Sequence, residues 1–200
     1  MTEKKPGLDT EPTPNQNEKP KDPKDNPYFA LDTIKTGTLS EISFDLAETD
    51  ERLRSALFER ISKEGGTEEG EVWAKEALEL DQPLSPEEQE QLVSLISDPY
   101  IASEVLSVNE TIERKFTPLQ REKLMTHIES DEDVAYMFYV QITEAGIEDP
   151  SESEAWLIDR LEKVLVQTEN PEYAEYLLDH STTLSDSDRE KLANVRDGTA

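Results

Sequence analysis

Residues 98–128, DPYIASEVLSVNETIERKFTPLQREKLMTHI, contain the signals for two consecutive helices. Asp98 precedes Pro99, an order that favours a helix start, because Asp accepts bonds from free backbone N–H groups and Pro is preorganised for the first turn. Thr117-Pro118-Leu119-Gln120 is a capping box that starts the second helix. Apolar residues then recur three and four positions apart in both segments, which is the period of an amphipathic helix.

Both helix-start signals recur along the chain. An alanine follows a capping Asp or Asn by four positions at Ala30, Ala102, Ala135 and Ala174, and a looser copy is Glu71-Val72-Trp73-Ala74. Alanine is small where a neighbouring helix would cross, so it lets two backbones approach closely. The start of a partner helix follows at Leu39-Ser40, Leu84-Ser85, Phe116-Thr117 and Leu184-Ser185, with a degenerate copy at Pro150-Ser151.

The alanines recur at intervals of 28 to 44 residues, a range typical of stacked helix pairs. This pattern resembles HEAT-like α-solenoids and the leucine-rich-repeat-variant type of helical repeat over roughly residues 26–195. The resemblance implies a protein-binding scaffold and carries over no catalytic residue. We therefore expect an all-α fold of irregular helix-pair repeats. The alternative is a non-repetitive helical bundle, which would bring the helix near residue 50 against the one near residue 160.

The chain divides into three segments by composition. Residues 1–25 contain five prolines, five lysines and six acidic residues, cannot form a core, and are expected to be a disordered tail. An acidic all-α domain is expected over 26–195, followed by a flexible carboxyl terminus at 196–200. Gly65 and Gly66 mark the clearest internal break, which we interpret as a helix end followed by a loop.

The net charge of -27 restricts the class of partner. Binding to bare nucleic acid or to an anionic membrane depends on Lys and Arg, so both are excluded as expected partners. A negative field of this size attracts basic proteins instead. The sequence has no cysteine, no apolar segment of the signal-peptide type and no membrane span, so we expect a cytoplasmic protein without disulfides or thiolate metal sites.

No pattern in the sequence predicts an enzyme, a cofactor or a metal site. His127 lies at the predicted end of a helix, where it complements the helix dipole. His180, with Asp186 and Asp188 shortly after it, does not match a calcium-binding loop. The seven glycines form neither a phosphate-binding loop nor a dinucleotide fingerprint.

A stripe of residues two positions after each alanine is expected to point away from the packed face of its helix. These residues are Asp32, Glu76, Glu104, Met137 and Tyr176. The stripe is acidic at first and becomes apolar and aromatic toward the carboxyl end, which suits a basic, amphipathic segment of a partner. The predicted partner-binding residues are Glu76, Glu104, Tyr136, Met137 and Tyr176.

The expected function is a non-enzymatic protein-binding module or adaptor that engages a basic protein or peptide. One alternative is a structural component of a larger viral or secretory assembly, with the tail as a tether. Another is a nucleic-acid mimic, whose carboxylates imitate phosphates and occupy a DNA-binding protein.

Overall fold

The computed structural model describes residues 27–37, 39, 41–80, 83–111, 116–144 and 152–199, and within these ranges the regular secondary structure is entirely helical. The all-α prediction is therefore confirmed. The described helices are α1 (Pro27–Thr36), α2 (Glu41–Thr49), α3 (Glu51–Glu64), α4 (Glu68–Leu78), α5 (Pro86–Leu95), α6 (Pro99–Thr111), α7 (Pro118–Ile128), α8 (Glu132–Glu144), α9 (Glu152–Leu165), α10 (Pro171–His180) and α11 (Asp186–Arg196).

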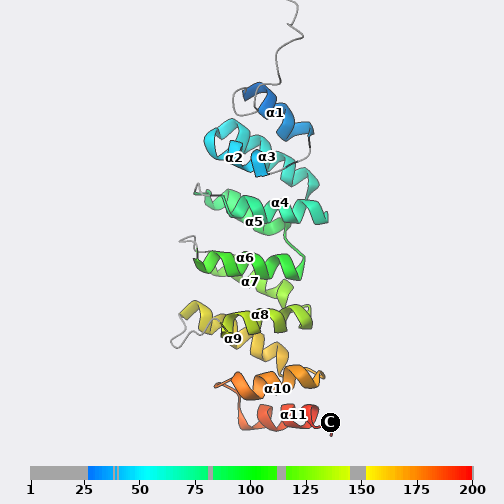
Figure 1. Ribbon diagram of the computed structural model, residues 1–200. Coiled ribbons are helices and arrows are strands. Elements are labelled where there is room, and N and C mark those ends of the chain that lie inside the picture. Colours follow the sequence, from blue (N-terminus) through cyan, green and yellow to red (C-terminus); the bar gives the residue numbers. More distant parts are fainter. Residues whose placement is uncertain are drawn as a thin grey trace, which may run out of the picture.

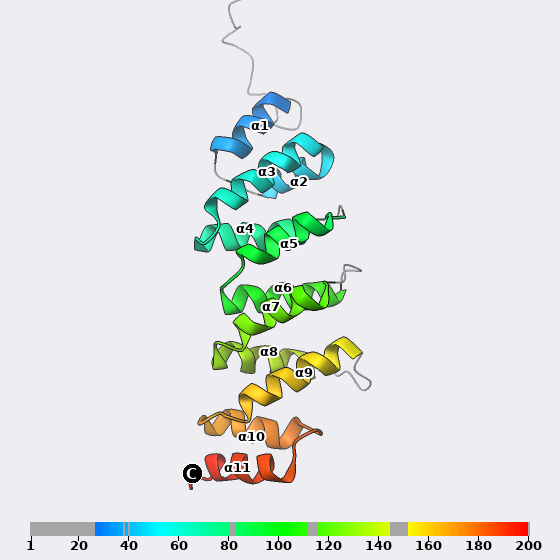
Figure 2. The ribbon, with the colours of Figure 1, turned by 180° about the vertical axis from the view of Figure 1, so that it is seen from behind.

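The helices form an elongated stack in chain order, with α1 and α11 at opposite ends (Figures 1 and 2). Three helices, α1 to α3, occupy one end, and four pairs follow: α4 with α5, α6 with α7, α8 with α9, and α10 with α11. Each extensive contact in the described residues joins helices no more than two places apart in the chain. The helix near residue 50 does not reach the one near residue 160, so the arrangement is a stack and not a bundle.

The pairs are arranged in two layers. We call α4, α6, α8 and α10 the alanine layer, and α5, α7, α9 and α11 the partner layer; Figure 2 shows α5, α7 and α9 in front of the helices that face the viewer in Figure 1. Within the alanine layer, Ala74, Ala102, Ala135 and Ala174 are each 0 % exposed. Helix α6 packs directly against both α4 and α8, which the small alanine side chains allow. The side chain of Ala30 lies outside the described residues.

The predicted helix starts are formed. Ser85 and Thr117 each make a complete capping box with the third residue of the following helix. Asn170 accepts a hydrogen bond from the backbone of Glu172 at 3.0 Å and is followed by Pro171 at the first helical position. Ser185 also caps its helix. The corresponding positions 26, 40 and 151 lie outside the described residues.

Two helix boundaries differ from those read from the sequence. Helix α4 begins one turn before its Glu71 copy of the signal, because the Thr67 side chain accepts from the Gly70 N–H at 3.0 Å and forms an earlier N-cap. The partner of α1 is divided into α2 and α3, because Asp50 is extended and caps α3 through the N–H of Arg52. The predicted break lies between α3 and α4, where Gly66 has φ +82.

The structure describes the carboxyl end of the chain up to residue 199 but not the amino-terminal segment. The predicted disordered tail, residues 1–25, lies outside the described residues. At the other end, Arg196 belongs to α11, and the backbone N–H groups of Gly198 and Thr199 donate to Val195 and Asn194 at 3.2 and 2.9 Å. Residues 197–199 therefore form a hydrogen-bonded end to α11.

One continuous core runs along the stack between the layers. It is built from apolar stripes of α1 to α3 and of both layers, as the helical period predicts. Its fully buried large side chains are Ile34, Leu57, Ile61, Leu92, Ile96, Leu124, Met125, Ile128, Tyr139, Leu161, Leu165 and Leu177.

Candidate protein-binding surface

The alanine layer carries almost no positive charge. Helices α6, α8 and α10 contain acidic residues but no Lys or Arg, and α4 contains the single cation Lys75. By contrast, α7, α9 and α11 of the partner layer each carry at least two Lys or Arg. Helix α5 of the partner layer also has no Lys or Arg, so the excess of negative charge is greater on the alanine layer but is not confined to it.

Three of the predicted partner-binding residues lie on the outer side of this layer. Glu76 is exposed, and Met137 is 50 % exposed, as predicted. Glu104 is partly exposed, and its carboxylate pairs with Lys75 of the neighbouring helix at 2.7 Å. Val72 and Tyr100, which the sequence analysis did not select, are 41 % and 53 % exposed.

Glu79, at the end of α4, is an unusual member of the same surface. Its Oε1 atom is buried and has no hydrogen-bond partner among the described residues. Burial raises the pKa of Glu79, the nearby charges of Glu76 and Glu104 raise it further, and Lys75 opposes them. The carboxylate is therefore held in an unfavourable environment between α4 and α6.

Tyr136 and Tyr176 do not point freely into solvent; both are half-buried in an aromatic cluster between α8 and α10. Tyr136 stacks on Tyr173 with ring centroids 3.9 Å apart, and Tyr176 stacks on His180 at 4.0 Å. Tyr176 also meets Tyr136 edge-on, at 5.6 Å. The outward orientation predicted for Tyr176 is therefore wrong, because its ring gains more from contacts with other rings than from exposure to water.

Polar contacts fix this aromatic cluster. The Tyr173 hydroxyl donates to Asp133 Oδ1 at 2.6 Å, and this bond, together with partial burial and the charge of Asp133, raises the pKa of Tyr173 to about 12. The hydroxyls of Tyr176 and Thr143 are 3.1 Å apart. His180 lies at the end of α10, and its Nδ1 is 2.9 Å from the Tyr176 carbonyl oxygen. This contact gives His180 a structural role at the helix end.

A buried carboxylate joins consecutive pairs at the start of α6. Glu71 of α4 is 6 % exposed and accepts three hydrogen bonds: from the Ser97 N–H at 2.9 Å, from its hydroxyl at 2.6 Å and from the Asp98 N–H at 2.7 Å. Burial alone would raise the pKa of Glu71, but these bonds together outweigh it and lower the pKa. Glu132 of α8 is exposed and accepts from the Thr168 hydroxyl just before α10. Both acids lie three positions before the buried alanine, a regularity that sequence analysis missed.

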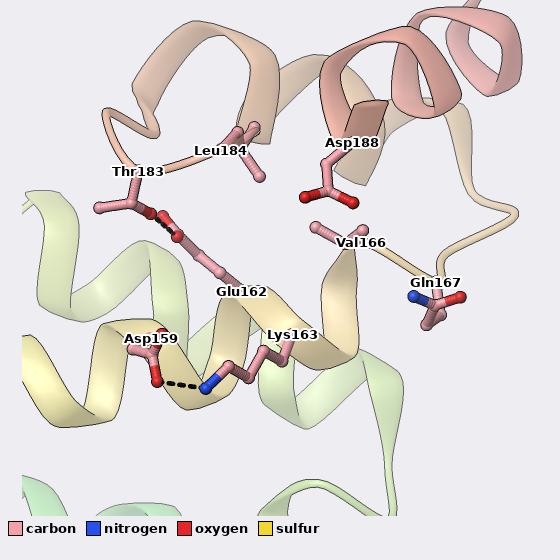
Figure 3. A pocket seen from close by; sticks show the side chains of 8 residues that line it. All are labelled: Asp159, Glu162, Lys163, Val166, Gln167, Thr183, Leu184 and Asp188. Carbon is pink, nitrogen blue, oxygen red and sulfur yellow. Dashed lines mark hydrogen bonds and ion pairs between the residues drawn. The ribbon is translucent and has the colours of Figure 1, made fainter. Parts of the chain in front are cut away.

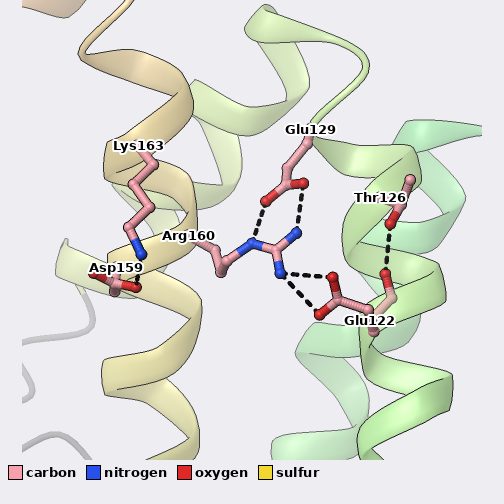
Figure 4. Close-up of polar contacts among 6 residues, drawn as sticks. All are labelled: Glu122, Thr126, Glu129, Asp159, Arg160 and Lys163. Carbon is pink, nitrogen blue, oxygen red and sulfur yellow. Dashed lines mark hydrogen bonds and ion pairs between the residues drawn. The ribbon is translucent and has the colours of Figure 1, made fainter.

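Arginines hold the partner layer together. Arg160 of α9 forms a two-bond fork with Glu129, at 2.6 and 2.7 Å, and its remaining terminal nitrogen donates to both oxygens of Glu122 at 2.7 and 2.8 Å (Figure 4). Arg54 of α3 makes a similar fork with Glu88 of α5 at 3.1 and 2.9 Å. These cations neutralise acids of the partner layer, so they do not reduce the field of the alanine layer.

A cavity of about 260 Å³ lies between α9 and α11 (Figure 3). Its buried acid, Glu162, accepts hydrogen bonds from the hydroxyls of Tyr139, at 2.9 Å, and Thr183. Lys163 pairs with Asp159 at 2.6 Å within the same wall. Because these groups satisfy one another, the cavity does not offer the free convergent polar groups of a small-molecule site.

The described residues contain no group of three or more His, Cys, Asp or Glu side chains placed to hold a metal ion. Within the same ranges, no helix has the length and apolar character needed to cross a bilayer. Comparison with protein-family models, curated proteins and solved structures found no match to this chain.

Proposed function

We propose that the chain is a protein-binding module and that the outer face of its alanine layer holds a basic segment of a partner protein. The observation that carries this proposal is the charge asymmetry of the stack: α6, α8 and α10 have no Lys or Arg, whereas α7, α9 and α11 each carry at least two, and Arg160 pairs with Glu122 and Glu129. Lys75 pairs with Glu104 at 2.7 Å, and the other acids of the layer attract a basic partner and orient it on one face.

Exposed apolar side chains on the same face support a protein partner. Val72, Tyr100 and Met137 each leave about half of their surface in water beside acidic neighbours. Contact with apolar groups and aromatic rings supplies most of the binding energy of protein interfaces, whereas charges mainly set the specificity and the association rate. A nucleic-acid mimic would need the carboxylates but not this apolar row.

A matched pair of charge variants tests the proposal. The alanine-layer variant carries Glu76→Gln, Glu172→Gln and Glu175→Gln, and the partner-layer variant carries Glu87→Gln, Glu90→Gln and Glu190→Gln. All six side chains are exposed, so both variants change the net charge equally without disturbing the core. The immobilised full chain and both variants are used to capture proteins from a lysate of the source cells, and the captured proteins are identified by mass spectrometry.

We expect basic proteins that are retained by the wild type and the partner-layer variant but lost from the alanine-layer variant. Their capture should weaken as salt is added, because exposed charges are screened. Equal loss from both variants would mean a general attraction to a polyanion and would contradict the proposal. Displacement of the same proteins by added duplex DNA would favour the nucleic-acid mimic instead.

We also propose that the helix pairs are diverged copies of one unit, as the resemblance to HEAT-like repeats implies. This is supported by the equivalent place of the buried alanine in α4, α6, α8 and α10. Stacked repeats commonly present an extended surface to partners.

A further inference from the structure

The exposed apolar residues of the alanine layer form a row across three successive helices of that layer, α4, α6 and α8. Val72 lies on α4, Tyr100 on α6 and Met137 on α8, and each is two positions from the buried alanine of its own helix. Two positions along an α-helix correspond to a rotation of about 200°. The three side chains therefore lie on the outer side of the stack, one for each helix.

An acidic residue lies one helical turn from each member of this row. Glu76 follows Val72 by four positions, Glu104 follows Tyr100 by four, and Asp133 precedes Met137 by four. Residues four apart on a helix are neighbours on the same side. The acids thus lie beside the row, toward the helix ends on α4 and α6 and toward the helix start on α8.

The spacing of the row selects the conformation of the segment that can cover it. Packed helices are about 8–10 Å apart. Seven residues of an α-helix rise about 10.5 Å and return to the same side within about 20°, so a helix lying across the row presents one side chain in seven to each helix of the stack. Three residues of a β-strand span a similar distance, but consecutive contacts would then point to opposite sides.

The width of the surface also favours a helix. A polyproline segment returns to the same side every third residue and would match the spacing, but it is narrow. The acids lie on both sides of the row, about one turn away. A helix with its side chains is about 10–12 Å across, so basic residues on both flanks of its apolar seam can reach them.

We propose that the outer face of α4, α6 and α8 binds an amphipathic α-helix of a partner protein, with an apolar residue at every seventh position and Lys or Arg on both sides of that seam. This inference rests on the proposed function and specifies its partner. The helix lies across the stack and contacts Val72, Tyr100 and Met137 in turn.

A designed peptide serves as the probe. It has roughly 21 residues, with leucine at every seventh position, lysines beside each leucine and alanine elsewhere. One comparison peptide has the same composition in scrambled order, and another is rich in proline with leucine at every third position. Binding to the full chain is measured by fluorescence anisotropy at fixed ionic strength.

We expect the heptad peptide to bind at least about tenfold more tightly than either comparison peptide. The double variant Tyr100→Ser with Met137→Ser should weaken its binding by about tenfold or more. Leu119→Ser is the matched control, because Leu119 is 71 % exposed on α7 of the partner layer. Circular dichroism melting curves check that the variants fold, and these surface sites should leave the melting temperature almost unchanged.

Other outcomes overturn the inference, and two of them separate it from the proposed function. Equal binding of the heptad and scrambled peptides, or binding insensitive to Tyr100 and Met137, would exclude a specific helix. If neutralising the alanine-layer acids still weakened that binding, the proposed basic partner would be retained and only its helical conformation would be rejected. Tighter binding of the proline-rich peptide would replace the helix by an extended segment. No binding of any peptide at low salt would contradict both proposals.

Discussion

Removing the Glu71 carboxylate tests whether this buried acid joins the pair α4 and α5 to the pair α6 and α7. This carboxylate accepts two backbone N–H groups and one hydroxyl at the start of α6. Glu71→Ala leaves the two N–H groups without a partner, and each unsatisfied buried donor costs about 1–3 kcal/mol. Because water can enter part of the space, we expect a loss of about 3 kcal/mol, a large fraction of the roughly 5–15 kcal/mol that stabilises a domain.

The dependence of this loss on pH identifies the carboxylate as its cause. The pKa of Glu71 is lower in the folded protein than its ordinary value of 4.5. Its stabilising effect is therefore complete above that value and is lost as the pH falls through the lower, folded-state pKa. Glu71→Gln keeps the shape but not the charge, so its difference in unfolding free energy from the wild type should shrink on acidification.

Urea unfolding at neutral pH and at a pH below the ordinary carboxylate range measures both effects. Glu76→Ala is the matched control, because Glu76 lies on the same helix and is exposed, and it should change stability by less than about 0.5 kcal/mol. A loss for Glu71→Ala no larger than that of the control would refute the reasoning. So would a Glu71→Gln difference that is unchanged by acid.

Four further substitutions, of which Lys163→Ala is a control, test other contacts. Arg160→Lys removes the fork between α9 and Glu129 at the end of α7 and should lower the unfolding free energy by about 1 kcal/mol. Lys163→Ala removes an exposed ion pair on α9 and should lower it by less than about 0.5 kcal/mol. Equal effects of the two substitutions in urea unfolding would contradict a stabilising role of the fork. Tyr139→Phe removes a donor from Glu162 and should cost about 1–2 kcal/mol. Burial and the charge of Glu162 raise the pKa of Tyr139, so it should be the last tyrosine to ionise in a spectrophotometric titration. Glu79→Gln should stabilise the chain at neutral pH and lose that advantage as the pH falls through the raised pKa, which thermal melts at several pH values measure.

N-cap residues predicted most of the helix starts, because the hydrogen bonds of an N-cap are made to residues only two or three positions away in the sequence. Ser85, Thr117 and Asn170 start helices where their sequences indicate, and the alanine positions identify buried faces. The division at Asp50 was missed, although Asp is a favoured N-cap residue, because the apolar period continues across it. The start of α4 was also missed, because Thr67 caps the helix one turn before the Glu71 copy of the signal.

The candidate surface was predicted less well, because exposure depends on neighbouring helices. Val72 and Tyr100 lie two positions before the alanine and are as exposed as Met137, two positions after it. Periodicity places both positions on the outer side, but only the second was considered. Tyr176 has the same periodic position as Met137 and is nevertheless packed, because Tyr136, Tyr173 and His180 lie beside it.

The stack explains why a partner on the alanine layer would do more than occupy a surface. The extensive contacts among the described helices join near neighbours, so α4 and α8 are coupled through α6, which the buried carboxylate of Glu71 ties to α4. Repulsion among the acids of this layer opposes that coupling. A basic helix lying across α4, α6 and α8 would neutralise the acids and contact all three helices together. Because such a ligand binds the ordered stack and not the unfolded chain, its binding energy would add to the stability of the whole array.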